Sequence, residues 1–300
     1  MEIPIIVVSL AGLALGGHHF VAAAAAVGRR LGMSPLLVGA TIVAIGTSLP
    51  EWAISVGAAL RGYSDLSVGN VVGSNVCNVA LVLGLAAMVT PLAVGRAAVL
   101  RDGAVMLAAT GLLIAVTADG VITRPEGALL LGLAVLTVLA LVATGPSEPE
   151  PESAFHWWEV ARALGGLALV LVSSHFFVVA AKGLADTMGI PEWLVGVTVA
   201  AIGTSLPELV TSLAAAFQGR AGIVVGNVLG SSTMNVFFVL GTAAALRPMQ
   251  VGQFAVPDAA IFAALMLLPC AFLWTQLRVT RWEGGVLFAV GLAWYVQQVV

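Results

Sequence analysis

Apolar residues fill long stretches of the chain, and short polar segments separate these stretches. A helix needs about 20 apolar residues to cross a bilayer, and ten stretches approach that length. We therefore expect spanning helices over residues 3–27, 35–60, 66–90, 98–117, 122–143, 159–184, 192–217, 222–245, 255–275 and 282–299. The breaks between them mix charged residues with Gly or Pro, as turns do. The pattern predicts an all-α polytopic membrane protein with ten transmembrane helices.

One strongly hydrophilic segment divides these helices into two groups. Residues 145–153 read GPSEPEPES, a composition that favours an extended, solvated linker. We expect a first five-helix repeat over residues 1–143, an acidic linker over 144–157 and a second five-helix repeat over 158–300. Because five is odd, the second group enters the membrane from the opposite side, so the two repeats are inverted.

The chain carries the same two polar motifs in both halves. Residues 39–51 (GATIVAIGTSLPE) and 196–208 (GVTVAAIGTSLPE) agree at 10 of 13 positions. Residues 68–84 (VGNVVGSNVCNVALVLG) and 225–241 (VGNVLGSSTMNVFFVLG) agree at 11 of 17, and both pairs have an offset of 157. Many transporters are built from internal repeats of this kind, with their binding sites near the bilayer midplane.

Composition narrows the class of protein further. Hydrophobic residues make up 60 % of the chain and charged residues only 9 %, whereas a soluble domain has about 25 % charged residues. The net charge of −3 gives no reason to expect a nucleic acid partner. The two cysteines, Cys77 and Cys270, lie in apolar runs and form no metal-ligand spacing. The first apolar stretch lacks a basic segment before it, so we expect no cleavable signal peptide.

Basic residues indicate how the chain is oriented, because cytoplasmic loops are enriched in Lys and Arg. With both termini outside, the cytoplasmic side receives eight basic residues: Arg29, Arg30, Arg96, Arg101, Arg162, Arg220, Arg278 and Arg281. The outer side receives four: Arg61, Arg124, Arg247 and Lys182. We therefore expect a multi-pass protein of the cell membrane with its N-terminus and C-terminus outside. No obligate protein partner is evident.

The GTSLPE motif places a carboxylate, Glu51, close to the middle of a spanning helix. An ionised side chain there costs roughly 3 kcal/mol or more unless it faces a partner or a wet cavity. Pro50 has no N–H, which leaves the carbonyl of Gly46 without its helical partner. The hydroxyls of Thr47 and Ser48 then lie within about one turn of the carboxylate. Such hard oxygen donors suit Ca²⁺ or Na⁺. The second copy offers the same donors from Thr204, Ser205 and Glu208.

The second motif adds further polar groups at helical spacing. Ser74 and Asn78 lie one turn apart on one face, as do Ser231 and Asn235. Small residues four positions apart, at Gly69 and Gly73 and again at Gly226 and Gly230, permit close backbone approach. Simpler interpretations remain open: the carboxylates cap freed backbone groups, the hydroxyls bond back to helix carbonyls, and the serines only pack.

The doubled GTSLPE and GN-x-x-GS-x-x-x-N motifs resemble the α-repeats of the sodium/calcium exchanger branch of the calcium/cation antiporter superfamily, most of all its short prokaryotic members. The resemblance covers essentially the whole chain and implies Ca²⁺/Na⁺ exchange by alternating access, with Ca²⁺/H⁺ exchange as the alternative. It implies these metal-binding residues: Glu51, Glu208, Thr47, Ser48, Thr204, Ser205, Asn78, Asn235, Ser74, Ser231, Ala44 and Ala201. Ala44 and Ala201 would contribute backbone oxygens. The transported ions would be the substrates, with no cofactor.

Two departures from the family pattern bear on mechanism. Some relatives have Asp where this chain has Asn235, so the expected pocket holds two carboxylates. Potassium coupling is then not expected, and the number of Na⁺ ions exchanged is left open. His18, His19 and His175 lie on the first and sixth helices, where they are packed histidines or make transport sensitive to pH.

Two other classes of protein fit the sequence less well. An intramembrane enzyme has paired carboxylates, but this chain offers no nucleophile with a base and no metal-ligand His/Cys spacing. A cation channel is also built from broken helices, although channel filters commonly arise from rings of subunits.

The resemblance also implies that the first and sixth helices slide across the core. Small residues at Gly16–Gly17 and Ser173–Ser174, matched at the repeat offset, would permit such sliding.

Overall fold

A computed structural model describes residues 2–144, 156–188, 201–251 and 256–297. Within these residues, seven helices are long and apolar enough to cross a membrane, and the number is eight if one bent pair forms a single span. The final described helix, with 17 residues, is not among these seven. The span expected over 192–217 begins outside the described residues, as does almost all of the expected linker. Where the helices are described, their ends agree with the predicted segments to within about three residues.

The first half consists of long rods, some of them built from several helical pieces. Its elements are α1 (Glu2–Arg30), α2 (Pro35–Val38), η1 (Gly39–Val43), α3 (Ala44–Thr47), α4 (Leu49–Arg61), α5 (Ser64–Val76), η2 (Cys77–Val82), α6 (Leu83–Val89), β1 (Leu92–Ala93), α7 (Arg96–Thr117), β2 (Val121–Ile122) and α8 (Arg124–Thr144). The η elements are turns of π-helix, which appear mostly as single turns within α-helices and often mark functional sites.

The second half repeats this order wherever it is described. Its elements are α9 (Trp158–Thr187), α11 (Ala201–Thr204), α12 (Leu206–Phe217), α13 (Ala221–Met234), η4 (Asn235–Leu240), α14 (Gly241–Leu246), β3 (Met249–Gln250), α15 (Val256–Gln276), β4 (Arg278–Val279) and α16 (Arg281–Gln297). The rod α5–η2–α6 thus has a counterpart in α13–η4–α14.

Two short strand pairs, which sequence reasoning did not predict, join the halves at opposite ends of the bundle. Strand β1 pairs antiparallel with β4, and β2 pairs antiparallel with β3. At the repeat offset, β1 corresponds to β3 and β2 to β4. The two strand pairs are therefore equivalent: each joins one strand from the first half to the corresponding partner strand of the second half. This arrangement accords with the inverted relation expected from the sequence.

Glycines let the halves pack closely at equivalent positions. A Cβ on Gly84 would lie 2.9 Å from the Gly284 carbonyl oxygen, so α6 and α16 touch through their backbones. The equivalent contact joins α14 and α8, where a Cβ on Gly241 would lie 3.2 Å from the Gly127 oxygen. The close approach expected at Gly226 and Gly230 is confirmed: both glycines pack against backbone of the first broken rod, at Leu36 and Ala40. The matching partners of Gly69 and Gly73 would fall within 189–200, outside the described residues.

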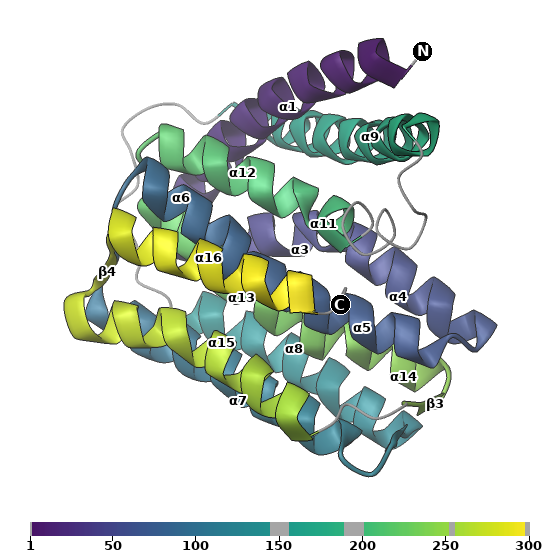
Figure 1. Ribbon diagram of the computed structural model, residues 1–300. Coiled ribbons are helices and arrows are strands. Elements are labelled where there is room, and N and C mark those ends of the chain that lie inside the picture. Colours follow the sequence, from purple (N-terminus) through teal and green to yellow (C-terminus); the bar gives the residue numbers. More distant parts are fainter. Residues whose placement is uncertain (1, 145–155, 189–200, 252–255, 298–300) are drawn as a thin grey trace.

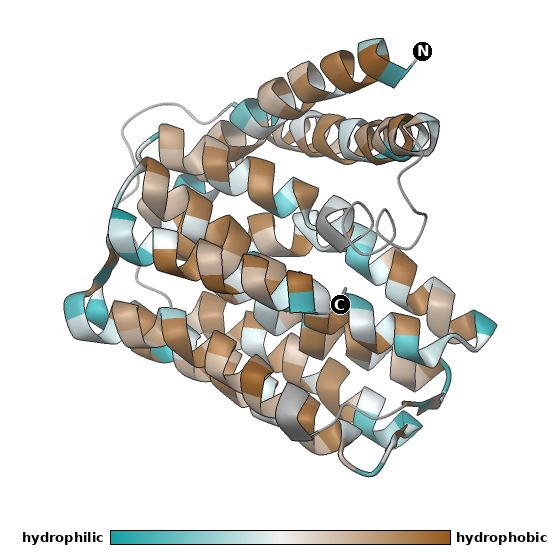
Figure 2. Cartoon of the chain, in the orientation of Figure 1, coloured by the Kyte–Doolittle hydropathy of each residue, from teal (hydrophilic) through white to brown (hydrophobic). Residues whose placement is uncertain are grey.

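Helices α1 and α9 form a pair on one side of the bundle, and α12 separates this pair from most of the remaining helices (Figure 1). Apolar residues predominate along most of the described helices (Figure 2). On α8, for example, Val135, Leu136 and Leu139 are each 60–61 % exposed. Exposed apolar side chains of this kind suit contact with lipid chains.

Candidate functional site

Both GTSLPE segments contain a real helix break, placed one residue after the threonine. Ser48 (φ −80°, ψ 7°) separates α3 from α4, and Ser205 (φ −88°, ψ 8°) separates α11 from α12. The two pieces of the first rod meet at an angle of 45°. Proline occupies one of the first two positions of each following helix, where its missing N–H costs nothing. The GTSLPE sequence thus produces the same helix break in both copies.

The two carboxylates lie in the first turn of the helix that follows each break. Unpaired backbone N–H groups at that end favour negative charge. Both Glu51 and Glu208 are 0 % exposed. Burial this complete requires polar partners, because an isolated buried carboxylate is very costly.

Each carboxylate accepts a hydrogen bond from the serine of the opposite motif. The Ser48 hydroxyl donates to Glu208 Oε1 at 3.1 Å, and the Ser205 hydroxyl donates to Glu51 Oε1 at 3.2 Å. This reciprocal exchange brings the two breaks together at one point inside the protein. It also leaves Oε2 of both Glu51 and Glu208 without a partner among the described residues.

The threonines and the helix serines extend the polar cluster. Thr47 donates to the Val43 carbonyl at 3.0 Å and also lies 3.4 Å from Asn227 Oδ1. The hydroxyls of Ser74 and Thr204 are 3.5 Å apart and again join the two halves. Ser231 bonds to Asn227 Oδ1 at 3.3 Å. Thr47 thus bonds back to its helix, as the simpler interpretation expected, while it also reaches across to the other half.

The two asparagines differ in their partners, although both are fully buried. Neither side-chain atom of Asn78 has a hydrogen-bond partner among the described residues. Asn235 donates from Nδ2 to Asn75 Oδ1 at 3.1 Å, and its own Oδ1 is left without a partner. Asn75 in turn donates to the Ser232 carbonyl at 3.1 Å. Because Asn75 is matched by Ser232 at the repeat offset, this network breaks the symmetry of the two halves.

Four buried oxygens of the predicted site residues therefore lack partners: Glu51 Oε2, Glu208 Oε2, Asn78 Oδ1 and Asn235 Oδ1. Buried polar atoms without partners are rare in folded proteins and call for a bound ion or water. Carboxylate and amide oxygens are the ligands of hard cations. The described residues contain no group of three or more His, Cys, Asp or Glu suited to a metal ion. The set thus fits a hard cation held by few charges.

The backbone oxygens expected from Ala44 and Ala201 stay a prediction. The Ala44 carbonyl already accepts the Ser48 N–H at 3.1 Å and lies 3.4 Å from the Thr47 hydroxyl. Ala201 is the first residue of α11. Both residues lie in the turn that leads into a break, which is where the resemblance places them.

Sequence reasoning missed two asparagines that hold the broken rods in place. Asn70 donates to the Ser55 hydroxyl at 2.9 Å and to the Glu51 carbonyl at 3.2 Å. Asn227 donates to the Ser212 hydroxyl at 3.0 Å. Asn70 matches Asn227, and Ser55 matches Ser212, at the repeat offset. The paired recurrence of an amide and a hydroxyl was the signal that would have found them.

The histidines lie apart from the carboxylates. Arg162 approaches His19 Nδ1 through Nε at 3.2 Å and through Nη2 at 3.1 Å, which ties α9 to α1. Gln218, at the end of α12, donates to the His18 carbonyl at 3.2 Å. The His175 ring lies edge-on to Phe176 at 5.6 Å. Within the described ranges, no hydrogen bond connects these histidines to the predicted site.

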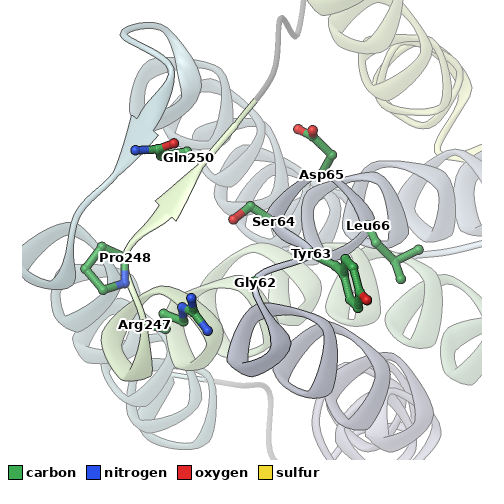
Figure 3. A pocket seen from close by; sticks show the side chains of 8 residues that line it. All are labelled: Gly62, Tyr63, Ser64, Asp65, Leu66, Arg247, Pro248 and Gln250. Carbon is green, nitrogen blue, oxygen red and sulfur yellow. The ribbon is translucent and has the colours of Figure 1, made fainter.

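A surface pocket of about 630 Å³ lies at one end of the bundle, between the α4–α5 turn and the segment from α14 to β3 (Figure 3). Its lining residues are Gly62, Tyr63, Ser64, Asp65, Leu66, Arg247, Pro248 and Gln250. None of the twelve predicted site residues lines it. Arg247 donates to the Leu60 carbonyl at 2.6 Å, so this arginine has a structural partner.

Comparison with known proteins agrees with the geometry. The family described as sodium/calcium exchanger protein matches residues 2–143 and 158–298. The chain is 31 % identical to sodium/calcium exchanger MaX1 of Methanosarcina acetivorans, over 97 % of each protein. It is 35 % identical to the putative antiporter CaxA of Alkalimonas amylolytica, over 94 % of this chain and 93 % of that one.

A solved structure gives the same result in three dimensions. The sodium–calcium exchanger NCX_Mj superposes with a TM-score of 0.88 at 30 % identity, over 98 % of this chain and 97 % of the other. The family match, the relatives and this fold thus extend over nearly the whole chain, including both copies of the motif. The protein is therefore a multi-pass membrane protein that belongs to the sodium/calcium exchanger family.

Proposed function

We propose that this antiporter exchanges Ca²⁺ for Na⁺ by alternating access and binds its ions where the two GTSLPE breaks meet. The observation that carries the proposal is the group of four buried oxygens without partners, two from carboxylates and two from amides. Two formal negative charges balance one Ca²⁺. Hydroxyls of Thr47, Ser48, Thr204 and Ser205 complete the polar surround, together with Ser74, Ser231 and the backbone oxygens of Ala44 and Ala201.

The proposed topology is ten spanning helices in two inverted repeats, with both termini outside. The exchanged pairing of β1 with β4 and of β2 with β3 supports the inverted relation. Residues near β1 and β4 lie at one end, where Arg281 donates to the Val89 carbonyl at 3.2 Å. Arg247 lies with β2 and β3 at the other end. The excess of arginines at the first end favours it as the cytoplasmic side.

The pair formed by α1 and α9 is the proposed moving unit. Its two helices pack backbone to backbone, since a Cβ on Gly166 would lie 2.7 Å from the Phe20 nitrogen. Its contacts with the breaks are side-chain contacts: Gly46 faces Leu167, and Gly203 faces Val178. A tightly joined pair that covers the site through side chains can move as one body, which accords with shear motion of packed helices.

The test is Ca²⁺ uptake into proteoliposomes under an imposed Na⁺, K⁺ or H⁺ gradient. The proposal expects uptake that depends on the Na⁺ gradient and needs no potassium. Uptake driven by the H⁺ gradient alone would replace Na⁺ by H⁺ as the coupling ion. Uptake that ignores every opposing gradient would identify a channel and contradict the proposal.

A further inference from the structure

The C-terminal helix α16 packs along the rod that carries Ser74 and Asn78. Gly284 and Gly84 bring the two backbones together at one end of this contact, and Gly291 meets Ala80 further along. At the far end Tyr295 is 7 % exposed, and its hydroxyl donates to the Gly73 carbonyl at 2.8 Å. The last helix of the chain thus ends in a buried hydrogen bond to the rod that bears the site.

This hydrogen bond falls where the helical geometry of the rod changes. Gly73 O already accepts the N–H of Cys77, the residue at which the π-helical turn begins. Ser74 follows Gly73 directly, and Asn78 follows Cys77. A turn of π-helix alters the direction of the side chains around it, so a bond at its start fixes how Asn78 is presented.

Two side chains, those of Cys77 and Ser205, lie between the phenol and the carboxylate of Glu51. The Cys77 thiol lies beside both the Tyr295 hydroxyl and the Ser205 hydroxyl. Ser205 donates to Glu51 Oε1 at 3.2 Å. Tyr295 therefore bounds the layer of side chains that surrounds the unpartnered oxygens, although it does not reach them itself.

The first half has no equivalent of this phenol. At the repeat offset, Tyr295 corresponds to Val138 on α8. Helix α8 packs against the second rod as α16 packs against the first, through Gly127 and Gly241. In that rod Asn235 is held by Asn75, whereas Asn78 has no partner of its own among the described residues. The Tyr295 hydroxyl thus packs against the rod whose asparagine, Asn78, has no hydrogen-bond partner among the described residues.

We propose that Tyr295 is a positioning residue of the cation site, which holds the Gly73–Asn78 segment so that Ser74 and Asn78 face the bound ion. This inference rests on the proposed function, because it assumes that a cation occupies the site. Tyr295 makes no contact with the ion and acts through the Gly73 carbonyl. Its hydroxyl therefore affects the affinity for the ion, whereas the glycine contacts between α16 and the rod stabilise the fold.

The test is Tyr295→Phe, which removes the hydroxyl and keeps the ring. The control is Tyr63→Phe, because Tyr63 is the only other tyrosine in the chain and is 63 % exposed. Equilibrium Ca²⁺ binding should weaken about fivefold in Tyr295→Phe, the equivalent of about 1 kcal/mol for one buried hydrogen bond. The rise in thermal unfolding temperature that Ca²⁺ produces should shrink, while the temperature without Ca²⁺ stays close to that of the wild type. Tyr63→Phe should change none of these.

A second comparison separates positioning from packing. In an Asn78→Ala background, Tyr295→Phe should weaken Ca²⁺ binding clearly less than it does in the wild type, because one of the two groups that it positions is gone. Equal losses in both backgrounds, or an unfolding temperature lowered without Ca²⁺ while affinity stays normal, would overturn the inference. Failure of the proposed function looks different: the wild type itself would then show no Na⁺-dependent Ca²⁺ uptake.

Discussion

Glycine at position 17 should control how fast the protein alternates between its two faces. A Cβ added there would lie 2.9 Å from Val210 Cγ1 and 3.5 Å from Ala214 Cβ, both on α12. Carbon atoms pack best at about 3.5–4.0 Å, so Val210 would have to move in the resting state. If α1 slides past α12 during transport, the added methyl group must pass further side chains of α12, so its clash is larger in the intermediate positions than at rest.

The size of the effect follows from the overlap. Overpacking in a well-packed contact costs typically about 1–3 kcal/mol. If Gly17→Ala adds about 1 kcal/mol to the barrier, turnover falls about fivefold, and about 3 kcal/mol for Gly17→Leu lowers it more than about 100-fold. Equilibrium Ca²⁺ affinity should change little, because Gly17 makes no contact with the carboxylates in the described part of the chain.

The neighbouring glycine supplies a matched control. A Cβ on Gly16 would lie 3.0 Å from the Gly166 carbonyl oxygen, inside the α1–α9 pair. If the pair moves as one body, as proposed, Gly16→Ala should lower thermal stability without the selective loss of turnover. The assays are initial rates of Ca²⁺ uptake in proteoliposomes and equilibrium Ca²⁺ binding. If binding falls in step with rate in Gly17→Ala, or if Gly16→Ala slows transport equally, sliding at the α1–α12 contact is wrong.

Two further predictions concern the charge of the site and the residues that support it. Asn235→Asp should lower the Na⁺ concentration that half-displaces Ca²⁺, because it adds a third carboxylate; an unchanged value would place position 235 outside the ion-binding shell. Asn227→Ala should lower the free energy of unfolding by about 1–3 kcal/mol and lower the unfolding temperature more than Asn70→Ala does. The reason is that Asn227 is 0 % exposed and has three side-chain partners. A larger effect of Asn70→Ala would refute the idea that these contacts of Asn227 stabilise the fold.

Much of the architecture could be predicted because lipid imposes a simple pattern. Helices must be long and apolar, and polar interruptions stand out against them, so helix ends and both breaks were predictable from the sequence. Pro50 and Pro207 place each break, and the repeat offset identifies Glu51 with Glu208. The count of ten spans stays a prediction, because part of the second repeat lies outside the described residues.

Contacts between the halves could not be predicted in the same way. The offset pairs Ser48 with Ser205, but it does not reveal that each serine bonds to the carboxylate of the other motif. Such exchange depends on how the two rods cross, which the spacing within either rod does not fix. The strand pairs were missed for a related reason, since two-residue strands leave no alternating pattern.

Asymmetric features were also hidden by the repeat itself. The repeat points to residues that are the same in both halves. Asn75 and Tyr295 have no such counterpart, and their contacts are with residues distant in the sequence. Asn70 and Asn227 occur twice, but their role appears only when the serine partners are seen at 2.9 Å and 3.0 Å. The proposed cation site thus combines a symmetric pair of carboxylates with asymmetric support.

The central claim is that Glu51 and Glu208 together hold the transported Ca²⁺, and equilibrium Ca²⁺ binding in the presence of increasing Na⁺ tests it most directly. The wild type should bind one Ca²⁺ per chain and release it as Na⁺ rises. Glu51→Gln and Glu208→Gln should each weaken binding at least about 30-fold, because loss of one partner in a buried charge pair costs about 2 kcal/mol or more, while the protein stays folded. Near-normal, Na⁺-sensitive Ca²⁺ binding by both variants would contradict the account.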